Sequence, residues 1–365
     1  MKRDGPIRLL TVEASPLFNT LLRGALGRRR DIILTPSATG LTAVRDRILA
    51  FHPDVIVLDL ALTETETRTL LKELRENYPV PILGCAGGGQ REARSALKLI
   101  QRGLLDVVVK PTGTGTEPIR KLGEELARKI LAAVEEARPI LRSPSRQYVP
   151  ATMTFQRAGI DPRKRLIVVG ASTGGTEALR IFLRNMPQDS PPIVIVQHMP
   201  VTFTASFAEH LNNDTPLRVS EAAEGDAVVS GRVFVARGDT HLTVRWNVQG
   251  WYARYTHTKP VNRHCPSVDV LFESAAQAAG DKAVGILLTG MGSDGAHGLL
   301  QLHQAGALTV AQSAVSCVVF GMPKVAMQLG AVDLVGAPEE IPQLVIQAMS
   351  RRAPSAAYVS EFPRG

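Results

Sequence analysis

The chain has 365 residues, of which 44% are hydrophobic and 21% charged, and this composition predicts a globular protein with two domains. Its apolar runs are shorter than the roughly 18–20 residues that a membrane helix needs, and its basic N-terminus lacks the features of a signal peptide, so we expect a cytoplasmic protein without membrane insertion. The formal net charge of +8 is concentrated in one segment, which argues against a nucleic-acid-binding surface, and the three widely spaced cysteines predict neither disulfides nor a zinc site.

Residues 1–137 alternate between strand-like and helix-like patterns. Apolar runs predict five strands, and amphipathic segments between and after them predict helices, so we expect a doubly wound (βα)5 domain with a parallel sheet. The predicted strands are Ile7–Val12, Ile32–Thr35, Val55–Leu60, Val80–Leu83 and Leu105–Val109.

Three polar residues follow strand ends in this domain, at the edge where such folds place their sites. Glu13 follows the first strand, Asp59 ends the third and Lys110 follows the fifth. With Pro111 after the lysine, the set resembles a response-regulator receiver domain, in which an aspartate accepts a phosphoryl group beside Mg²⁺ and a lysine. The resemblance implies that Asp59 is the phosphoacceptor and that Glu13 and Lys110 support it.

Two positions depart from the receiver pattern. Ala14 stands where a second acid is usual, and Ala86 stands where Ser or Thr is usual. The first change removes an oxygen ligand from a cation that requires near-octahedral oxygen coordination, and the second removes a hydroxyl that would hold the phosphoryl group. Two alternatives stay open: phosphorylation of Asp59 with Mg²⁺ at Glu13 and Asp59, or a silent regulatory module.

Residues 138–165 hold seven basic residues against one acid in a Pro- and Ser-containing stretch, which predicts a solvated linker or, alternatively, a contact surface for an acidic partner. Residues 166–352 predict a second doubly wound domain with a mainly parallel sheet. Three alternating segments predict antiparallel hairpins inserted in it: Arg232–Ala236, Leu242–Trp246 and Trp251–His257. We expect residues 353–365 to be a disordered tail.

A glycine-rich turn at Gly170–Gly175 joins a buried strand to a helix in this second domain. Such a turn either raises a serine nucleophile or cradles a phosphate. His198 and Asp294 also follow predicted parallel strands, so we expect them to meet Ser172 at one sheet edge. A serine hydroxyl needs an imidazole to take its proton, and the imidazole needs a carboxylate to orient it and to offset its charge. The three residues therefore predict a serine hydrolase, with the backbone N–H groups of Thr173 and Met291 as oxyanion donors.

Five motifs together resemble those of the chemotaxis protein-glutamate methylesterases, which join a receiver to an esterase domain. They are Gly170-Ala-Ser-Thr-Gly-Gly175, Gln197-His-Met-Pro200, Pro266-Ser-Val-Asp-Val-Leu-Phe272, Thr289-Gly-Met-Gly-Ser-Asp-Gly295 and Gly321-Met-Pro323. The resemblance implies that Ser172 is the nucleophile, His198 the base and Asp294 the orienting acid. It implies glutamate γ-methyl esters on chemoreceptor cytoplasmic helices as substrate, some receptor glutamines as a second substrate, no catalytic cofactor, and a chemotaxis histidine kinase as phosphodonor.

Two other functions are weighed against this one. A dinucleotide-binding reductase would use the same glycine turn and the Tyr255–Lys259 pair, but a strand-like pattern surrounds Tyr255 and no acid follows the second strand of the domain. A catalytically silent scaffold coupled to a receiver is the non-enzymatic alternative. Loss of ester hydrolysis in a folded Ser172→Ala variant would separate enzyme from scaffold.

Overall fold

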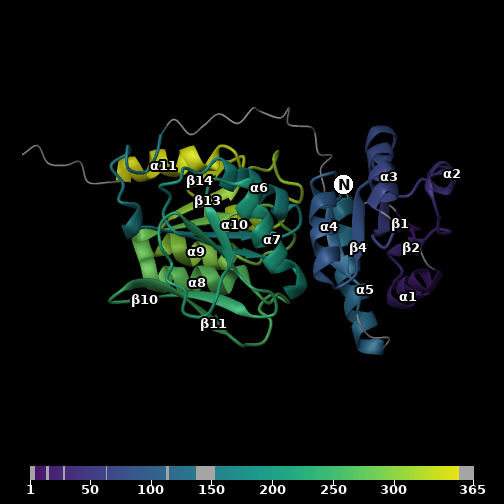
Figure 1. The fold of residues 1–365 in the computed structure, drawn as a ribbon, viewed down its shortest axis with the longest axis horizontal. Helices are drawn as coiled ribbons and strands as arrows, with labels where there is room; N and C mark the ends of the chain where they lie inside the picture. Colours follow the sequence, from purple (N-terminus) through teal and green to yellow (C-terminus); the bar gives the residue numbers. More distant parts are fainter. Residues whose placement is uncertain are drawn as a thin grey trace, which may run out of the picture.

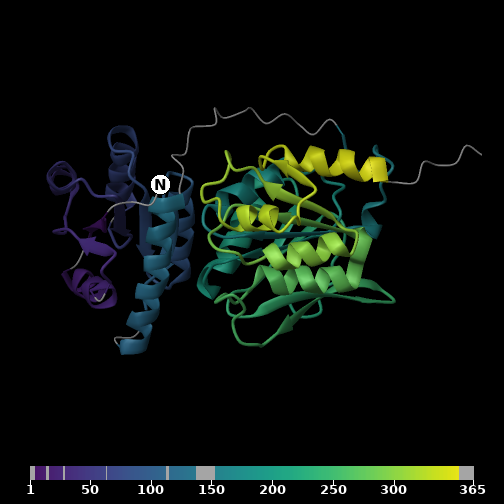
Figure 2. The same ribbon diagram turned by 180° about the vertical axis from the view of Figure 1, so that it is seen from behind.

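The computed structural model describes residues 5–13, 16–27, 29–62, 64–111, 115–136 and 153–352. Within these ranges the chain forms two α/β bodies side by side, each built on its own parallel sheet (Figure 1, Figure 2). Ala14, most of the expected linker and the expected disordered tail lie outside the described residues.

The first body is the expected doubly wound domain, with strand order β2-β1-β3-β4-β5 and parallel pairing throughout. Helices lie on both faces of this sheet. Its strands are β1 (Ile7–Val12), β2 (Ile32–Leu34), β3 (Val55–Asp59), β4 (Ile82–Ala86) and β5 (Asp106–Val109). Its helices are α1 (Pro16–Leu26), α2 (Leu41–Phe51), α3 (Glu64–Asn77), α4 (Gln90–Ile100) and α5 (Thr116–Leu131), which continues into a π-helical turn at Ala132–Glu136.

Coverage on both faces explains why β3 is apolar along nearly its whole length. Ile56 and Leu58 pack into one buried cluster, and Val55 and Val57 pack into another on the opposite face. Each fully buried side chain of this kind stabilises the fold by about 1.5–3 kcal/mol relative to an exposed one. The polar residue that ends the strand, Asp59, is thereby fixed at the carboxyl edge of the sheet.

The second body is built on a seven-stranded parallel sheet with the order β14-β13-β12-β6-β7-β9-β8. Its strands are β6 (Leu166–Ala171), β7 (Ile193–Gln197), β8 (Arg218–Glu221), β9 (Arg232–Val235), β12 (Ala283–Leu287), β13 (Leu308–Gln312) and β14 (Leu334–Gly336). Its helices are α6 (Gly175–Arg184), α7 (Val201–Asp214), α8 (Val268–Ala279), α9 (Ala296–Gln304), α10 (Met322–Gln328) and α11 (Ile341–Arg352), with 3-10 turns at Pro162–Lys164 and Gly280–Lys282.

The hairpin prediction is correct for two of the three segments. Strands β10 (His241–Asn247) and β11 (Gly250–Thr256) form an antiparallel pair. The Arg232–Ala236 segment was wrongly assigned to a hairpin, because β9 pairs in parallel with both β7 and β8. After the half-buried Arg232, its residues Val233, Phe234 and Val235 are all buried in the clusters on the two faces of the sheet.

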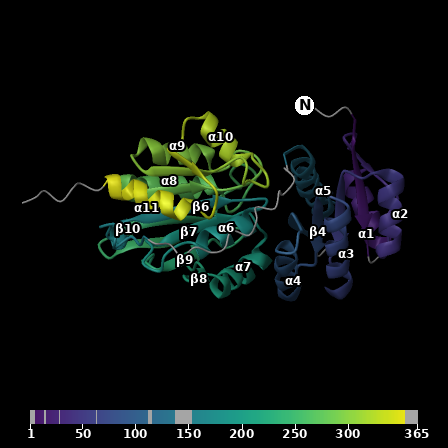
Figure 3. The same cartoon turned by 90° about the horizontal axis from the view of Figure 1, so that it is seen from above.

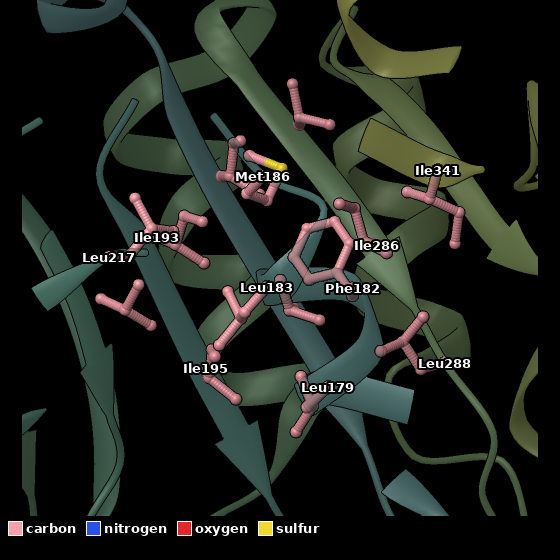
Figure 4. Close-up of a cluster of buried hydrophobic side chains, with 14 of the residues drawn as sticks. Leu179, Phe182, Leu183, Met186, Ile193, Ile195, Leu217, Ile286, Leu288 and Ile341 are labelled. Atoms are coloured by element: carbon pink, nitrogen blue, oxygen red, sulfur yellow. The ribbon is translucent and has the colours of Figure 1, made fainter. Parts of the chain in front are cut away.

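Alternate residues of the central strands fill the two halves of the core. Ile193 and Ile195 of β7 pack with Phe182 of α6 on one face, as Figure 4 shows, and Val194 and Val196 pack with Phe272 of α8 on the other. This packing fixes the strand ends relative to each other, and those ends carry the candidate site.

The two bodies meet where α4 lies against α7 (Figure 3). Leu97 of α4 is 4% exposed and belongs to the same buried cluster as Phe207 of α7. Arg94 lies 2.8 Å from Glu209 at the edge of this contact. Among the helices described, none is long and apolar enough to cross a membrane.

Candidate active site

Three adjacent strands bring the predicted catalytic segments to one edge of the seven-stranded sheet. β6 lies between β12 and β7, and the hydrogen bonds continue past the strand ends. Ser172 N–H donates to the Thr289 carbonyl (3.0 Å), and His198 N–H donates to the Ala171 carbonyl (3.1 Å). Ser172 and His198 are therefore neighbours across two strands, as the sequence predicted.

Glycine at position 290 allows the turn after β12 to press against the serine. A Cβ on Gly290 would lie 2.7 Å from Ser172 Cβ, closer than real Cβ contacts permit. On the other side, Gly174 adopts a φ of 78° and is the N-cap of helix α6. The helix N-terminus thus lies directly behind Ser172, where its N–H groups favour negative charge.

The side chains of His198 and Asp294 are joined by a hydrogen bond. His198 Nε2 donates to Asp294 Oδ2 over 2.8 Å. Nε2 must carry the proton in this bond, so Nδ1 is the basic nitrogen of the neutral ring. Nδ1 is buried and has no hydrogen-bond partner in the described part of the chain. An unprotonated imidazole nitrogen is what a general base requires, and in this structure Nδ1 makes no hydrogen bond to Ser172.

Asp294 is held as a carboxylate despite its burial. Its side chain is 1% exposed. Burial raises the pKa of Asp294, but the hydrogen bond and charge of His198, followed by the hydrogen bonds from Asn262 and Ser267, outweigh this and hold the pKa below its usual value. Ser267 Oγ donates over 2.7 Å, and the Val268 backbone N–H at the start of α8 donates over 2.7 Å.

A two-residue turn that the sequence analysis did not identify contacts both members of this pair. Asn262 Nδ2 donates to Asp294 Oδ1 (2.9 Å), and the His264 ring stacks on the His198 ring. Asn262 and Arg263 both have positive φ, at 52° and 68°. An asparagine that tolerates this conformation was the available signal for a turn, but nothing local to the sequence indicates which side chains the turn would reach.

The two predicted oxyanion donors lie on the turns around Ser172. Thr173 is 3% exposed and its carbonyl accepts a bond from Thr289 Oγ1 (3.0 Å), which ties the two turns together. Met291 directly follows the glycine that faces Ser172. Gln197 Nε2 also donates to the Ser172 carbonyl (2.9 Å), a support that the sequence analysis did not assign.

The receiver-like residues also gather at one sheet edge. Lys110 Nζ lies 2.5 Å from Asp59 Oδ1, and the Ala61 N–H donates to the same oxygen (2.9 Å). Asp59 Oδ2 and Glu13 Oε2 are both buried without a hydrogen-bond partner among the described residues. Two orphaned carboxylate oxygens are ligands of the type that a hard divalent cation takes.

Tyr255, half of the pair that suggested a reductase, is engaged in structural hydrogen bonds. It lies in β11, and its hydroxyl donates to the Ala222 carbonyl (2.9 Å) and accepts from the Arg237 N–H (3.0 Å). Tyr255 therefore links β11 to the segments at Ala222 and Arg237.

No cluster of three or more His, Cys, Asp or Glu suited to a metal occurs in the described ranges.

The space beside His198 is small because the receiver-like body covers it. A cavity of about 20 Å³ lies between His198 and Phe203 on one side and Val107 and Lys129 on the other. This volume holds about one water molecule. An open depression of about 740 Å³ lies at the opposite, amino-terminal ends of the strands, near Asp161 and Asp189, away from the proposed chemistry.

Known proteins of one description match nearly the whole chain. Residues 167–345 match the family model described as CheB methylesterase. The chain is 39% identical to protein-glutamate methylesterase/protein-glutamine glutaminase 1 of Dechloromonas aromatica, over 94% of this chain and 98% of that protein. It is 37% identical to the protein of the same description from Salmonella typhimurium, over 94% and 97%. The crystal structure of the Thermotoga maritima CheB methylesterase catalytic domain aligns at 36% identity with 50% of this chain and 98% of that one, at a TM-score of 0.49.

Proposed function

The chain belongs to the CheB methylesterase family, and we propose that it hydrolyses the γ-methyl esters of glutamate side chains on chemoreceptor cytoplasmic helices, releasing methanol. The same acyl transfer with ammonia as leaving group would deamidate receptor glutamines. A cytoplasmic location follows from that substrate. The observation that carries the proposal is the His198–Asp294 bond beside Ser172, at the ends of three adjacent strands.

Acylation begins when Ser172 Oγ attacks the ester carbonyl carbon and its proton passes to His198 Nδ1. Asp294, already ionised and hydrogen-bonded to Nε2, stabilises the imidazolium that forms. The backbone N–H groups of Thr173 and Met291 receive the oxyanion, and losing one such donor typically costs about 2.7–4 kcal/mol. The imidazolium then gives its proton to the methoxy oxygen, and methanol leaves.

Deacylation repeats the sequence with water. His198 Nδ1 takes a proton from water, the hydroxide attacks the acyl carbon, and the tetrahedral intermediate collapses to return Ser172 as a free hydroxyl. The imidazolium gives its proton to Ser172 Oγ in this collapse, and the glutamic acid product then releases its own proton to solvent as the carboxylate. We propose that neither step needs a cofactor.

The test compares methanol release from a methylated receptor by the wild type and by Ser172→Ala. We expect a loss of at least roughly 10³-fold in the variant. Ser220→Ala, at the far edge of the sheet on β8, serves as the matched control and should keep full activity. Equal rates in wild type and Ser172→Ala, with folding intact by circular dichroism, would favour the silent scaffold.

We also propose that the receiver-like domain gates the esterase. Residues of the receiver-like domain, Val107 and Lys129 among them, line the cavity beside His198, and this supports the proposal. Deleting residues 1–137 should therefore raise turnover on methylated receptor. Unchanged turnover would count against occlusion.

Phosphorylation of Asp59 is proposed as the signal that opens the gate, with a chemotaxis histidine kinase as donor. Glu13 and Asp59 would hold Mg²⁺ through their orphaned oxygens, and the cation would neutralise the phosphoryl group. Neither Ala14 nor Ala86 offers a side-chain oxygen, so this pocket would hold both groups with fewer ligands. The test is an acid-labile adduct formed from a phosphodonor with Mg²⁺ and absent in Asp59→Asn; failure to form it would leave a silent docking module.

A further inference from the structure

His264, which the proposed mechanism does not use, lies flat against the proposed base. The ring centroids of His264 and His198 are 3.7 Å apart, and the ring planes differ by 5°. The backbone of His264 is fixed in turn, because its N–H and carbonyl pair with Val261 at 2.9 and 3.0 Å. The same turn carries Asn262, which binds Asp294. One short loop therefore contacts both the imidazole and the carboxylate.

The stack supplies a restraint that His198 otherwise lacks. Its ring has one side-chain hydrogen bond, from Nε2 to Asp294, while Nδ1 has no partner in the described part of the chain. A single bond of this kind leaves the ring free to tilt about the bond axis. A second planar ring in van der Waals contact restricts that tilt and fixes the plane of the His198 ring.

The charge state of His264 suits this role. Burial lowers the pKa of His264 to about 3, and the charges of His198, Arg128 and Lys129 act in the same direction, while Asp294 opposes them. The ring is therefore neutral at physiological pH. A neutral aromatic face stabilises a cation stacked on it, whereas a second imidazolium would repel the one that forms during acyl transfer.

The receiver-like domain reaches this ring pair from the other side. Arg128, on α5, places Nη1 3.5 Å from His264 Nε2. A guanidinium can only donate, so it favours the His264 tautomer with its proton on Nδ1. It also brings a fixed positive charge to the edge of the His264 ring, where it opposes the positive charge that forms on His198 during acyl transfer.

We propose that His264 is a positioning residue for the catalytic imidazole and that Arg128 of the docked receiver-like domain acts on the triad through it. The proposal rests on the proposed function of the triad. It goes beyond gating of access: the docked domain restrains the chemistry of Ser172 as well as covering it.

The test is a double-mutant cycle in the full chain, read as the rate at which a small fluorophosphonate labels Ser172. His264→Phe keeps a stacked planar ring but offers no nitrogen to Arg128. In the wild-type background we expect Arg128→Met to raise the labelling rate roughly 3- to 30-fold. In the His264→Phe background we expect a clearly smaller effect, because only the direct action of the Arg128 charge on His198 remains.

Arg94→Met is the matched control, because it breaks an ion pair with Glu209 in the same domain contact but away from the ring stack. Its effect on labelling should be equal in both backgrounds, as expected of a change in docking alone. If Arg128→Met also has equal effects in both, Arg128 acts only on docking and the link through His264 is refuted.

The positioning role is tested in the Arg128→Met background, where the contact between Arg128 and His264 is already removed. His264→Ala should lower kcat on methylated receptor roughly 3- to 30-fold with KM unchanged, and His264→Phe or added free imidazole should restore it. Wild-type kcat in His264→Ala would overturn this role. If His264→Ala does not fold, the Phe cycle alone decides the coupling. Fluorophosphonate labelling reads the nucleophilicity of Ser172 for any ester, so a failed receptor assay would bear on the proposed function and leave the cycle interpretable.

Discussion

Asn262→Gly isolates the contribution of one amide to the proposed catalytic site. Asn262 Nδ2 donates to Asp294 Oδ1 over 2.9 Å and to Asp269 Oδ2 over 2.6 Å, so it bridges two buried carboxylates. Its φ of 52° lies in the left-handed region, which glycine adopts without strain. The substitution therefore removes the amide and leaves the backbone of the turn in place.

The expected magnitude follows from these two bonds. A hydrogen bond to a charged group contributes about 1.5–3 kcal/mol, and glycine adds about 0.5–1 kcal/mol of backbone entropy to the unfolded chain. Asp294 keeps its bonds from Ser267 and from the start of α8, which limits the loss. We expect the free energy of unfolding to fall by about 2–4 kcal/mol and kcat to fall roughly tenfold.

The loss should grow with pH. Burial raises the pKa of Asp269, the Gly298 N–H lowers it, the charge of Asp294 raises it, and the Asn262 amide lowers it. A raised carboxyl pKa means that the folded state binds the proton more tightly than the unfolded state, so this group costs stability as pH rises above about 4. Without the amide the pKa of Asp269 rises further, and the cost at pH 8 exceeds that at pH 4.

Urea unfolding followed by tryptophan fluorescence measures this domain alone, because Trp246 and Trp251 are the two tryptophans of the chain. Asn185→Gly is the control: Asn185 donates to the Ile181 carbonyl over 2.8 Å, a bond to a neutral group. It should cost about 1 kcal/mol at both pH values. Equal costs for the two variants, at pH 4 and at pH 8, would refute the bridging argument.

Three further substitutions test other contacts. Gly290→Ala should lower kcat for methanol release roughly 10²-fold and should also lower the unfolding midpoint, because the new Cβ would collide with both Ser172 and the buried Met322; a wild-type kcat would contradict this. Lys110→Met should destabilise the receiver-like domain by about 3 kcal/mol in thermal unfolding, because it leaves the buried Asp59 carboxylate unpaired. Leu97→Ala should weaken docking by about 2 kcal/mol and raise turnover on methylated receptor, and a decrease would argue against occlusion.

The parts of the site that the sequence predicted depend on rules of sheet topology. Ser172 and His198 each end a run of buried apolar residues, and parallel strands present such ends at one edge whatever the details of packing. The same rule placed Asp59 and Lys110 together in the first domain. In each case the position of the residue at the end of a predicted strand was sufficient to predict its place in the fold.

The parts that the sequence did not predict depend on packing between distant segments. The turn at Asn262 and His264 lies in an irregular stretch without periodicity, and its contacts exist because α8 and β12 hold their partners nearby. Strand β8 escaped detection because Arg218 and Glu221 lie at an exposed sheet edge, where one buried residue, Val219, carries the whole apolar signal. The error at β9 has another cause: Val233, Phe234 and Val235 are all buried, and the strand pairs in parallel on both sides, which the residue types of this short segment do not reveal.

The order of β6, β7 and β12 in the central sheet sets a condition on when the enzyme can first act. Ser172 and His198 emerge early from the ribosome, but the carboxylate arrives only with the segment after β12, which pairs on the far side of β6. A nascent or prematurely terminated chain that stops before residue 294 therefore carries the proposed nucleophile and base without the proposed orienting acid. The N-terminal domain is synthesised before this segment, so the receiver-like domain is already present when the esterase domain is completed.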